Sequence, residues 1–478
     1  MRWRSPAQAL LSWLTLSSSQ NCAGSPVGPP RRVSGVDAPL DHRLALNDQA
    51  RFLAQRATGL TPVAQWVWVY DRSVDLDGLK RFHRNLGYGL LGRRIERSPL
   101  PFGRHRWVCS PASADIDIAR YARPRAELIG WADERAQLPL DPQWGPGWHV
   151  GVQPFSDGST AVSLVASHCL VDGAGGCLAI VDAVKGNVDS PGYPLPGSRS
   201  RARAVVSDAL HTARGLPAIV QALIAAARQS RHRSRGGGQS GRSGRLVVAR
   251  GNDDAVAVPA IAIHIDVGDW DTRAAALGGS SNALFTAFAA KLGERVGCRR
   301  ANDGAIRVGM TVNDRAEGDT RANAFSLATI DVDLTRITSD LSNVRAGIRR
   351  ALGTFSAVRG EQLKLLPLIA LMPEWAARRL AHMFLATPAV GCSYLGDVDP
   401  AVGRPDGTEA DSFFVRGVTQ HVSRQIVEQV SGMTAASAAR IGGTICIAVT
   451  AYQSVERRLL GELAAATLAE FNLTGLIV

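Results

Sequence analysis

The sequence predicts an α/β or α+β protein made of two halves of similar size. Apolar β-rich runs and amphipathic helical segments are mixed on both sides of the midpoint, which is typical of sheets layered with helices. Residues 228–245 (RQSRHRSRGGGQSGRSGR) lack the apolar side chains that a core needs, so they indicate a linker between the halves. The 478 residues and 45% hydrophobic content provide for a large core and exclude a wholly disordered chain.

These features divide the chain into four parts. Residues 1–36 contain four arginines and no acidic residue, and we expect them to form a disordered basic segment. The N-terminal half covers 37–227, the linker 228–245 and the C-terminal half 246–478. Basic residues followed by a short apolar stretch also give the N-terminus the outline of a signal segment, and this alternative stays open.

In the N-terminal half, runs of β-branched, aromatic or alternating residues predict strands at 63–71, 104–109, 148–155 and 160–169. The last run, TAVSLVASHC, is almost continuously apolar, as expected of a strand buried on both faces. Helices are predicted at 75–87, where Asp75 can cap the first turn, at 178–186 after a Gly-rich turn, and over 201–227. Pro217 should divide the last of these into two segments.

The C-terminal half repeats the mixture. The same patterns predict strands at 260–267, 305–313, 325–334, 390–396 and 442–452, and helices at 282–297, 339–355, 361–385 and 455–471. Because strands and helices are mixed rather than segregated, each half should be a sheet covered by helices.

The net charge of +12 is unevenly distributed. Ten of the twelve charges lie in 1–36 and 228–245, so the remainder of the chain is nearly neutral. These arginines have no interleaved aromatic residues, which disfavours a nucleic-acid binding protein. The linker adjoins the mostly apolar segment 216–227, which is too short to span a bilayer, and this combination predicts peripheral association with an anionic inner membrane face or a lipid droplet.

Cysteine and motif content narrows the class further. The seven cysteines are scattered singly, without CxxC pairs or Cys/His clusters, which favours a reducing, cytoplasmic compartment and no metal site. No P-loop, H-E-x-x-H or G-x-S-x-G motif occurs in the sequence, so these phosphate-binding, zinc and serine-nucleophile sites have no local support.

The informative motif is His168-Cys169-Leu170-Val171-Asp172-Gly173, which follows the buried strand and opens into a Gly-rich turn. Imidazole is the side chain best suited to accept a proton near neutral pH. Asp172 can orient the loop by pairing with a distant arginine, and Gly173 allows the backbone to turn sharply or approach a ligand. From these residues alone, a core histidine that caps its own loop remains the alternative.

With its neighbouring segments, the motif resembles the bacterial wax ester synthase/diacylglycerol acyltransferases. These belong to the superfamily of CoA-dependent acyltransferases, which includes chloramphenicol acetyltransferase and peptide-synthetase condensation domains. The resemblance follows the order of the chain through most of 38–475, in the segments 38–59, 69–86, 138–155, 167–173, 276–292, 307–334 and 390–398. Matching family-motif positions outside the histidine motif are Pro146, Trp148, Asn282, Asn323 and Ser393.

The resemblance implies two chloramphenicol-acetyltransferase-like sandwich halves with the active-site tunnel between them. His168 would be the general base that deprotonates the acceptor, which then attacks an acyl thioester directly. Asp172 would be structural, with Arg315 as its expected partner, and Gly173 would keep the tunnel mouth open. Acyl-CoA would be a co-substrate, with no bound cofactor and no metal.

The expected activity is therefore transfer of a long-chain acyl group from acyl-CoA to a hydrophobic alcohol, either diacylglycerol or a long-chain alcohol. Two alternatives stay open: a donor bound to a carrier protein, and a non-catalytic lipid- or membrane-binding protein of the same fold. The chain departs from the family pattern where Ser167 replaces the first of two histidines, Ala283 replaces an aspartate and Tyr394 replaces an asparagine.

Overall fold

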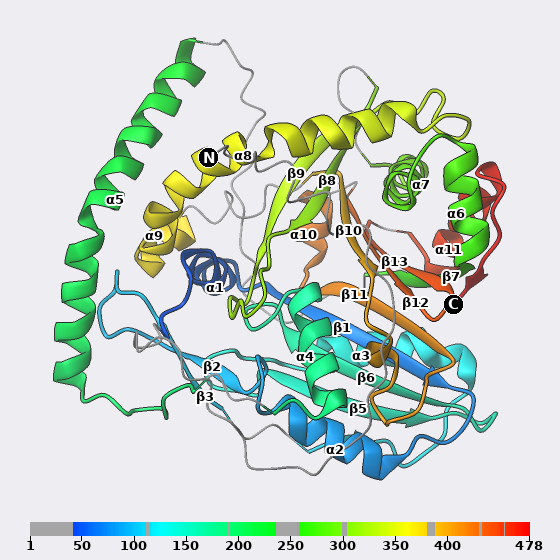
Figure 1. Cartoon of the computed structure of the whole chain (residues 1–478), viewed down its shortest axis with the longest axis horizontal. Coiled ribbons are helices and arrows are strands. Elements are labelled where there is room, and N and C mark those ends of the chain that lie inside the picture. The colour runs from blue at the N-terminus through cyan, green and yellow to red at the C-terminus, as the bar shows by residue number, and fades with distance from the viewer. Residues whose placement is uncertain are drawn as a thin grey trace, which may run out of the picture. The chain divides into compact units, whose positions relative to one another are not determined.

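A computed structural model describes residues 42–110, 115–188, 192–235, 256, 258–298, 304–379, 388–429, 433–453 and 455–478. His42–Val478 form one compact unit by themselves. The basic segment 1–36, with its signal-like outline, lies outside the described residues, as does the part of the 228–245 linker after Arg235. Sheets and helices alternate through the compact unit, which confirms the predicted mixed α/β class (Figure 1).

The first sheet has five strands, of which four come from the N-terminal half. Its neighbours pair antiparallel, except that β4 is parallel to β5. The strand order is β11 (Ser412–Gln420), β1 (Thr61–Tyr70), β6 (Thr160–Ser167), β5 (Trp148–Pro154) and β4 (Asp117–Ile118). β11 comes from the C-terminal half, so the two halves share this sheet.

The second sheet has seven strands, all from the C-terminal half. β10 is parallel to both of its neighbours, β8 and β12, and the other pairs are antiparallel. The order is β14 (Leu476–Ile477), β7 (Ala260–Asp266), β13 (Thr444–Tyr452), β12 (Met433–Ile441), β10 (Val390–Asp397), β8 (Ile306–Asn313) and β9 (Phe325–Val332). A separate hairpin joins β2 (Arg93–Glu96) to β3 (Arg106–Cys109).

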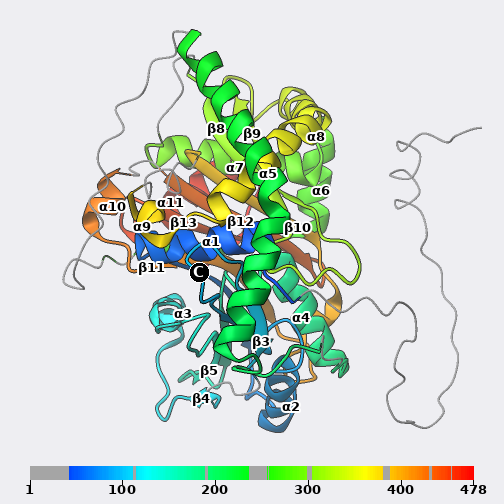
Figure 2. The ribbon, with the colours of Figure 1, turned by 90° about the vertical axis from the view of Figure 1, so that its left-hand side faces the viewer.

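Helices cover both sheets (Figures 1 and 2). Around the five-stranded sheet lie α2 (Leu76–Leu86), α4 (Gly173–Lys185) and α3 (Leu128–Gln137), and around the seven-stranded sheet lie α6 (Val267–Ala276), α7 (Ser281–Arg295) and α11 (Arg457–Glu470). The other helices are α1 (Leu46–Thr58), α5 (Arg201–Arg235), α8 (Ser342–Ala370), α9 (Glu374–Arg379) and α10 (Arg424–Gln429). No described helix is both long and apolar enough to cross a membrane.

Each sheet has its own hydrophobic core. Trp66 and Trp68 project from β1 and are fully buried among residues of α2 and α4, as the apolar run of this strand requires. Phe285 and Phe288 of α7 are buried against the seven-stranded sheet. Burying an aromatic side chain of this size contributes about 1.5–3 kcal/mol, so these cores hold the strand ends that carry the site in place.

A buried polar network holds β11, the strand contributed by the C-terminal half, in the five-stranded sheet. The Arg416 side chain is only 2% exposed, and its Nε donates to Gln65 Oε1 at 2.8 Å. Its Nη2 lies 2.7 Å from Asp133 Oδ1 of α3. Because a buried charge is tolerated only when it is paired, these contacts fix β11 against β1.

Three local expectations were wrong. Pro217 does not divide the helix over 201–227, because α5 continues through it to Arg235. The helix expected at 178–186 begins at Gly173, where the Asp172 side chain caps it. The helix expected over 361–385 is divided, since α8 ends at Ala370 and α9 begins at Glu374 directly after Pro373. The last residues of that expected helix, 380–385, lie outside the described residues.

Candidate functional site

The histidine motif lies between the last residue of β6, Ser167, and the first residue of α4, Gly173. The Asp172 carboxylate caps α4 by accepting a hydrogen bond from the Gly175 N–H at 2.6 Å. Backbone contact also fixes the start of the loop, because the His168 N–H donates to Pro62 O of β1 at 3.0 Å. The buried strand and the capped helix therefore hold the histidine at a set position.

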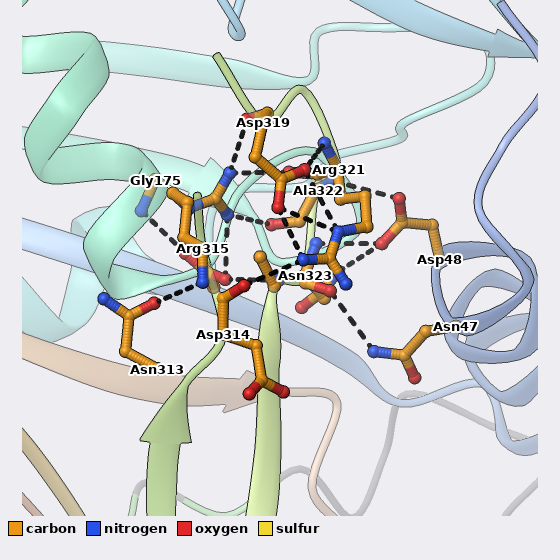
Figure 3. Close-up of polar contacts among 12 residues, drawn as sticks. Asn47, Asp48, Gly175, Asn313, Asp314, Arg315, Asp319, Arg321, Ala322 and Asn323 are labelled. Atoms are coloured by element: carbon orange, nitrogen blue, oxygen red, sulfur yellow. Dashed lines mark hydrogen bonds and ion pairs between the residues drawn. The ribbon is translucent and has the colours of Figure 1, made fainter. Parts of the chain in front are cut away.

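Asp172 and Arg315 form a buried ion pair. Arg315 Nη2 donates to Asp172 Oδ2 at 2.9 Å, and the two side chains are 3% and 5% exposed. The same carboxylate oxygen accepts from the Ala324 N–H at 2.8 Å. Arg315 Nη1 donates to the backbone carbonyls of Asp319 and Arg321, at 3.0 and 2.9 Å (Figure 3). All the bonds of Asp172 go to neighbouring protein groups, so it shapes the loop.

The orientation of Asn323 determines which ring nitrogen of His168 carries the proton. Asn323 Nδ2 donates to His168 O at 3.0 Å and to Asp48 Oδ1 at 3.3 Å. Both of these atoms only accept, so the amide oxygen must be the atom that faces His168 Nδ1, at 2.9 Å. In a neutral imidazole Nδ1 is then the donor, which leaves the lone pair on Nε2.

Asp48 of α1 holds Asn323 from the other side. Its two carboxylate oxygens accept from the backbone N–H groups of Ala322 at 2.9 Å and Asn323 at 2.8 Å (Figure 3). Burial raises the pKa of Asp48, although these hydrogen bonds and the Arg93 charge oppose that change. The buried carboxylate thus anchors the loop after β8 from α1, while Asp172 anchors it from α4.

The electrostatic surroundings keep His168 neutral. Burial lowers the pKa of His168 from its ordinary 6.5 to about 4, the Arg51 charge lowers it further, and Asp172 opposes both effects. The imidazole and the Phe325 ring are in edge-to-face contact, with the ring centres 6.0 Å apart. At neutral pH the side chain is therefore an unprotonated base.

His168 lines a cavity of about 190 Å³ that both sheets enclose. Gly173 and Leu395 also line this cavity. A Cβ added to Gly173 would lie 3.3 Å from Leu395 Cδ2, so a side chain there would narrow the cavity. Hydroxyl groups come from the opposite sheet, where Thr311 Oγ1 donates to Ser393 Oγ at 3.2 Å. A small polar group can therefore lie next to the histidine inside a partly apolar wall.

Of the other family-motif positions, Ser393 lines this cavity, and Asn323 contacts the histidine. Trp148 is buried at the start of β5, where Nε1 donates to Leu91 O at 2.9 Å, and Pro146 precedes it after a cis peptide bond. Asn282 lies in the first turn of α7, where its carbonyl accepts from Thr286 Oγ1. These three are not among the cavity-lining residues.

Cys169 does not have the properties of a nucleophile. Burial raises the pKa of its thiol to about 12, and Sγ lies 2.9 Å from Gln55 Oε1. A thiol of this kind carries almost no thiolate at neutral pH. Within the described ranges, no three His, Cys, Asp or Glu side chains gather as a metal-binding group.

The residue pattern of α1 did not reveal two members of the site, Asp48 and Arg51. Both lie in LNDQARFLAQRAT, and they are one helical turn apart, so they share a face of the helix. A signal for them was available, because Asp48 is four residues before the apolar Phe52, so a charged group on that face would have to be buried or partly buried.

We compared the sequence and the fold with those of known proteins. No family model matches the sequence, and no curated protein does. Polyketide synthase associated protein 5 from Mycobacterium tuberculosis is 16% identical with a TM-score of 0.52, over 90% of this chain and 97% of that one. The wax ester synthase/diacylglycerol acyltransferase from Marinobacter aquaeolei VT8 is 13% identical with a TM-score of 0.51, over 90% and 98%. The first condensation domain of the CDA synthetase is 15% identical with a TM-score of 0.52, over 91% and 99%. These likenesses show a condensation-domain-like fold.

Proposed function

We propose that this protein is an acyltransferase that moves a long-chain acyl group from acyl-CoA to the hydroxyl of a hydrophobic alcohol. Diacylglycerol and long-chain alcohols are the first acceptors to consider. The observation that carries the proposal is the hydrogen bond between Asn323 and His168 Nδ1, because it leaves Nε2 as an unprotonated base at the cavity. The fold likeness to an acyltransferase named for these acceptors adds support.

The reaction needs one base and no covalent acyl-enzyme. His168 Nε2 takes the proton from the acceptor hydroxyl as its oxygen attacks the thioester carbonyl, forming a C–O bond. The tetrahedral intermediate then expels the thiolate by breaking the C–S bond, and the imidazolium returns the proton to sulfur. The ester and free CoA are the products. Asp172, Arg315 and Gly173 act by shaping the loop and the cavity.

A steady-state assay of CoA release from palmitoyl-CoA, with diacylglycerol or hexadecanol as acceptor, tests the proposal. His168→Ala should lower the rate by about 10²–10⁴, the usual contribution of a general base, with an unchanged near-ultraviolet circular dichroism spectrum. Cys169→Ala is the matched control and should stay active. An unchanged rate in His168→Ala would remove this histidine from the mechanism.

The acyl donor has a second candidate besides acyl-CoA. A fold neighbour is a polyketide synthase associated protein, which supports testing an acyl group carried by phosphopantetheine on a carrier protein. The same assay with palmitoyl-carrier protein in place of palmitoyl-CoA separates the two donors. Faster ester formation from the carrier protein would reassign the donor and leave the base unchanged.

A second function, non-catalytic lipid binding at a cytoplasmic membrane surface or lipid droplet, is favoured by α5. Its outward side chains Leu210, Val220 and Ile224 are 55%, 52% and 47% exposed and lie on one face of the helix, with Arg214 nearby. Sedimentation with phosphatidylglycerol and phosphatidylcholine vesicles tests this reading. Binding to anionic vesicles together with no CoA release in any assay would favour it over catalysis.

A further inference from the structure

Arg51 lies beside the proposed base without a role in the mechanism described above. It projects from α1, and its guanidinium carbon lies 5.2 Å from the centre of the Phe325 ring. The same ring contacts His168, with 6.0 Å between the ring centres, and both Phe325 and His168 line the cavity. Arg51 and the histidine therefore contact one aromatic side chain that lines the cavity, although Arg51 is not itself among the cavity-lining residues.

The Arg51 guanidinium has no ion pair or hydrogen bond to any residue in the described parts of the chain, and its Nε is shielded from solvent without an acceptor. The carboxylates nearby are already used: Asp48 accepts from two backbone N–H groups, and Asp172 pairs with Arg315. The other arginine of α1, Arg56, forms an ion pair in which Nη2 lies 2.8 Å from Asp141 Oδ1. Arg51 thus differs from its neighbours in keeping its donors unpaired.

An unpaired guanidinium at this position has two costs. Partial burial of a charge without a direct ion pair destabilises the folded protein, and Asp48 and Asp172 offset this only at a distance. Its positive charge also lowers the pKa of His168, which weakens the base. Both costs are removed when an anion binds to Arg51, because the anion accepts the free hydrogen bonds and offsets the charge next to the imidazole.

Resting on the proposed function, we infer that Arg51 binds a carboxylate or phosphate of the reacting substrate, so that the preferred acceptor is an amphiphilic alcohol with an anionic group a few bonds from its hydroxyl. A planar guanidinium over an aromatic ring is suited to two parallel hydrogen bonds to such an oxyanion. The phosphates of CoA are separated from the thioester by the whole pantetheine arm, whereas Arg51 shares Phe325 with the base. The anion therefore belongs to the acceptor.

Matched acceptor pairs test this inference in the CoA-release assay. Lysophosphatidic acid is compared with monoacylglycerol, and 12-hydroxydodecanoic acid with its methyl ester, so that the two pairs separate phosphate from carboxylate recognition. We expect the anionic member of at least one pair to have a kcat/KM at least tenfold higher. Arg51→Gln should abolish this preference, so that the ratio of kcat/KM between the anionic and the neutral member falls to about one, whereas Arg51→Lys should retain part of the preference.

Controls separate this inference from the proposed function. Arg81→Gln removes an exposed arginine of α2 and should leave the preference unchanged. Equal rates within both pairs in the wild-type protein, or a preference that persists in Arg51→Gln, would overturn the anion site but not the acyltransferase. If no acceptor releases CoA, catalysis fails, and equilibrium dialysis with lysophosphatidic acid decides the site: wild-type binding lost in Arg51→Gln supports it, and equal binding rejects it.

Discussion

Arg315 Nη2 donates a hydrogen bond to Asp172 Oδ2 at 2.9 Å, and this bond joins two residues that are 143 positions apart in the sequence. Asp172 caps the first turn of α4, and Arg315 lies in the loop after β8, so the pair connects the helix over the five-stranded sheet to the seven-stranded sheet. Asp48 holds the same loop from α1. The cavity around His168 therefore depends on two buried carboxylates that fix one loop.

Removing the arginine should leave a buried, uncompensated carboxylate. We expect Arg315→Ala to lower the free energy of unfolding by about 3–5 kcal/mol, measured by urea denaturation. Arg307→Ala, on adjacent β8, is the control: its ion pair with Asp331 at 2.8 Å is exposed and should contribute less than about 1 kcal/mol. Equal losses in the two variants would show that the Asp172–Arg315 pair has no special structural role.

Asn323 should act as a positioning residue for the base. Asn323→Ala removes the acceptor of the Nδ1 proton, so the imidazole is expected to populate both tautomers and the acyl-transfer rate to fall about 10-fold or more. Nitrogen-15 NMR of the His168 ring reports the tautomer directly, independently of catalysis. A ring that keeps its proton on Nδ1 in this variant would rule out the role.

Asn323→Asp distinguishes positioning from loss of packing. The carboxylate keeps the acceptor for Nδ1 but adds a negative charge at the ring, which should raise the pKa of His168 above its value of about 4. The lower limb of the pH–rate profile should then move to higher pH. A profile identical to that of the wild-type protein would show that this side chain does not act through the imidazole.

The sequence predicted the parts of this site that are local. The buried strand before His168 and the Gly-rich turn after it showed where the motif lies, because strand periodicity and turn chemistry act over a few residues. Arg315 was expected only through the family resemblance, since no spacing relates it to Asp172. β11 was not predicted, because its place in the other half's sheet depends on contacts of Arg416 with Gln65 and Asp133.

Three histidines whose pKa falls to about 4 should make the protein sensitive to mild acid. Burial lowers the pKa of His105, His149 and His168 from 6.5 to about 4, with smaller contributions from neighbouring arginines. Between these values the unfolded chain binds protons that the folded protein does not, so stability falls as pH falls from 6.5 towards 4. Asp48 acts in the opposite sense, because its pKa is raised.

Each of these histidines contributes up to about 1.4 kcal/mol per pH unit in this range. Urea denaturation at pH 7, 6 and 5 measures the slope, and the stability contribution should be complete above pH 6.5. His149→Gln removes one of the three groups and should reduce the slope by roughly 1 kcal/mol per pH unit. Stability that is constant from pH 7 to 5 would contradict the burial of neutral imidazoles.

The start of α4 is also packed tightly against β1. A Cβ on Gly176 would overlap the indole ring of Trp66, which is fully buried. Gly176→Ala should therefore lower the free energy of unfolding by about 1–3 kcal/mol or more, and should reduce acyl transfer by displacing the start of α4.

Gly215→Ala in α5 is the matched control, because no atom lies within 4 Å of the added Cβ and alanine is the better helix former. That control should be stabilised by about 0.5–1 kcal/mol. Opposite signs for the same chemical change would show that Gly176 is required by contact with Trp66, whereas a neutral Gly176→Ala would mean that α4 can shift without disturbing the His168 loop.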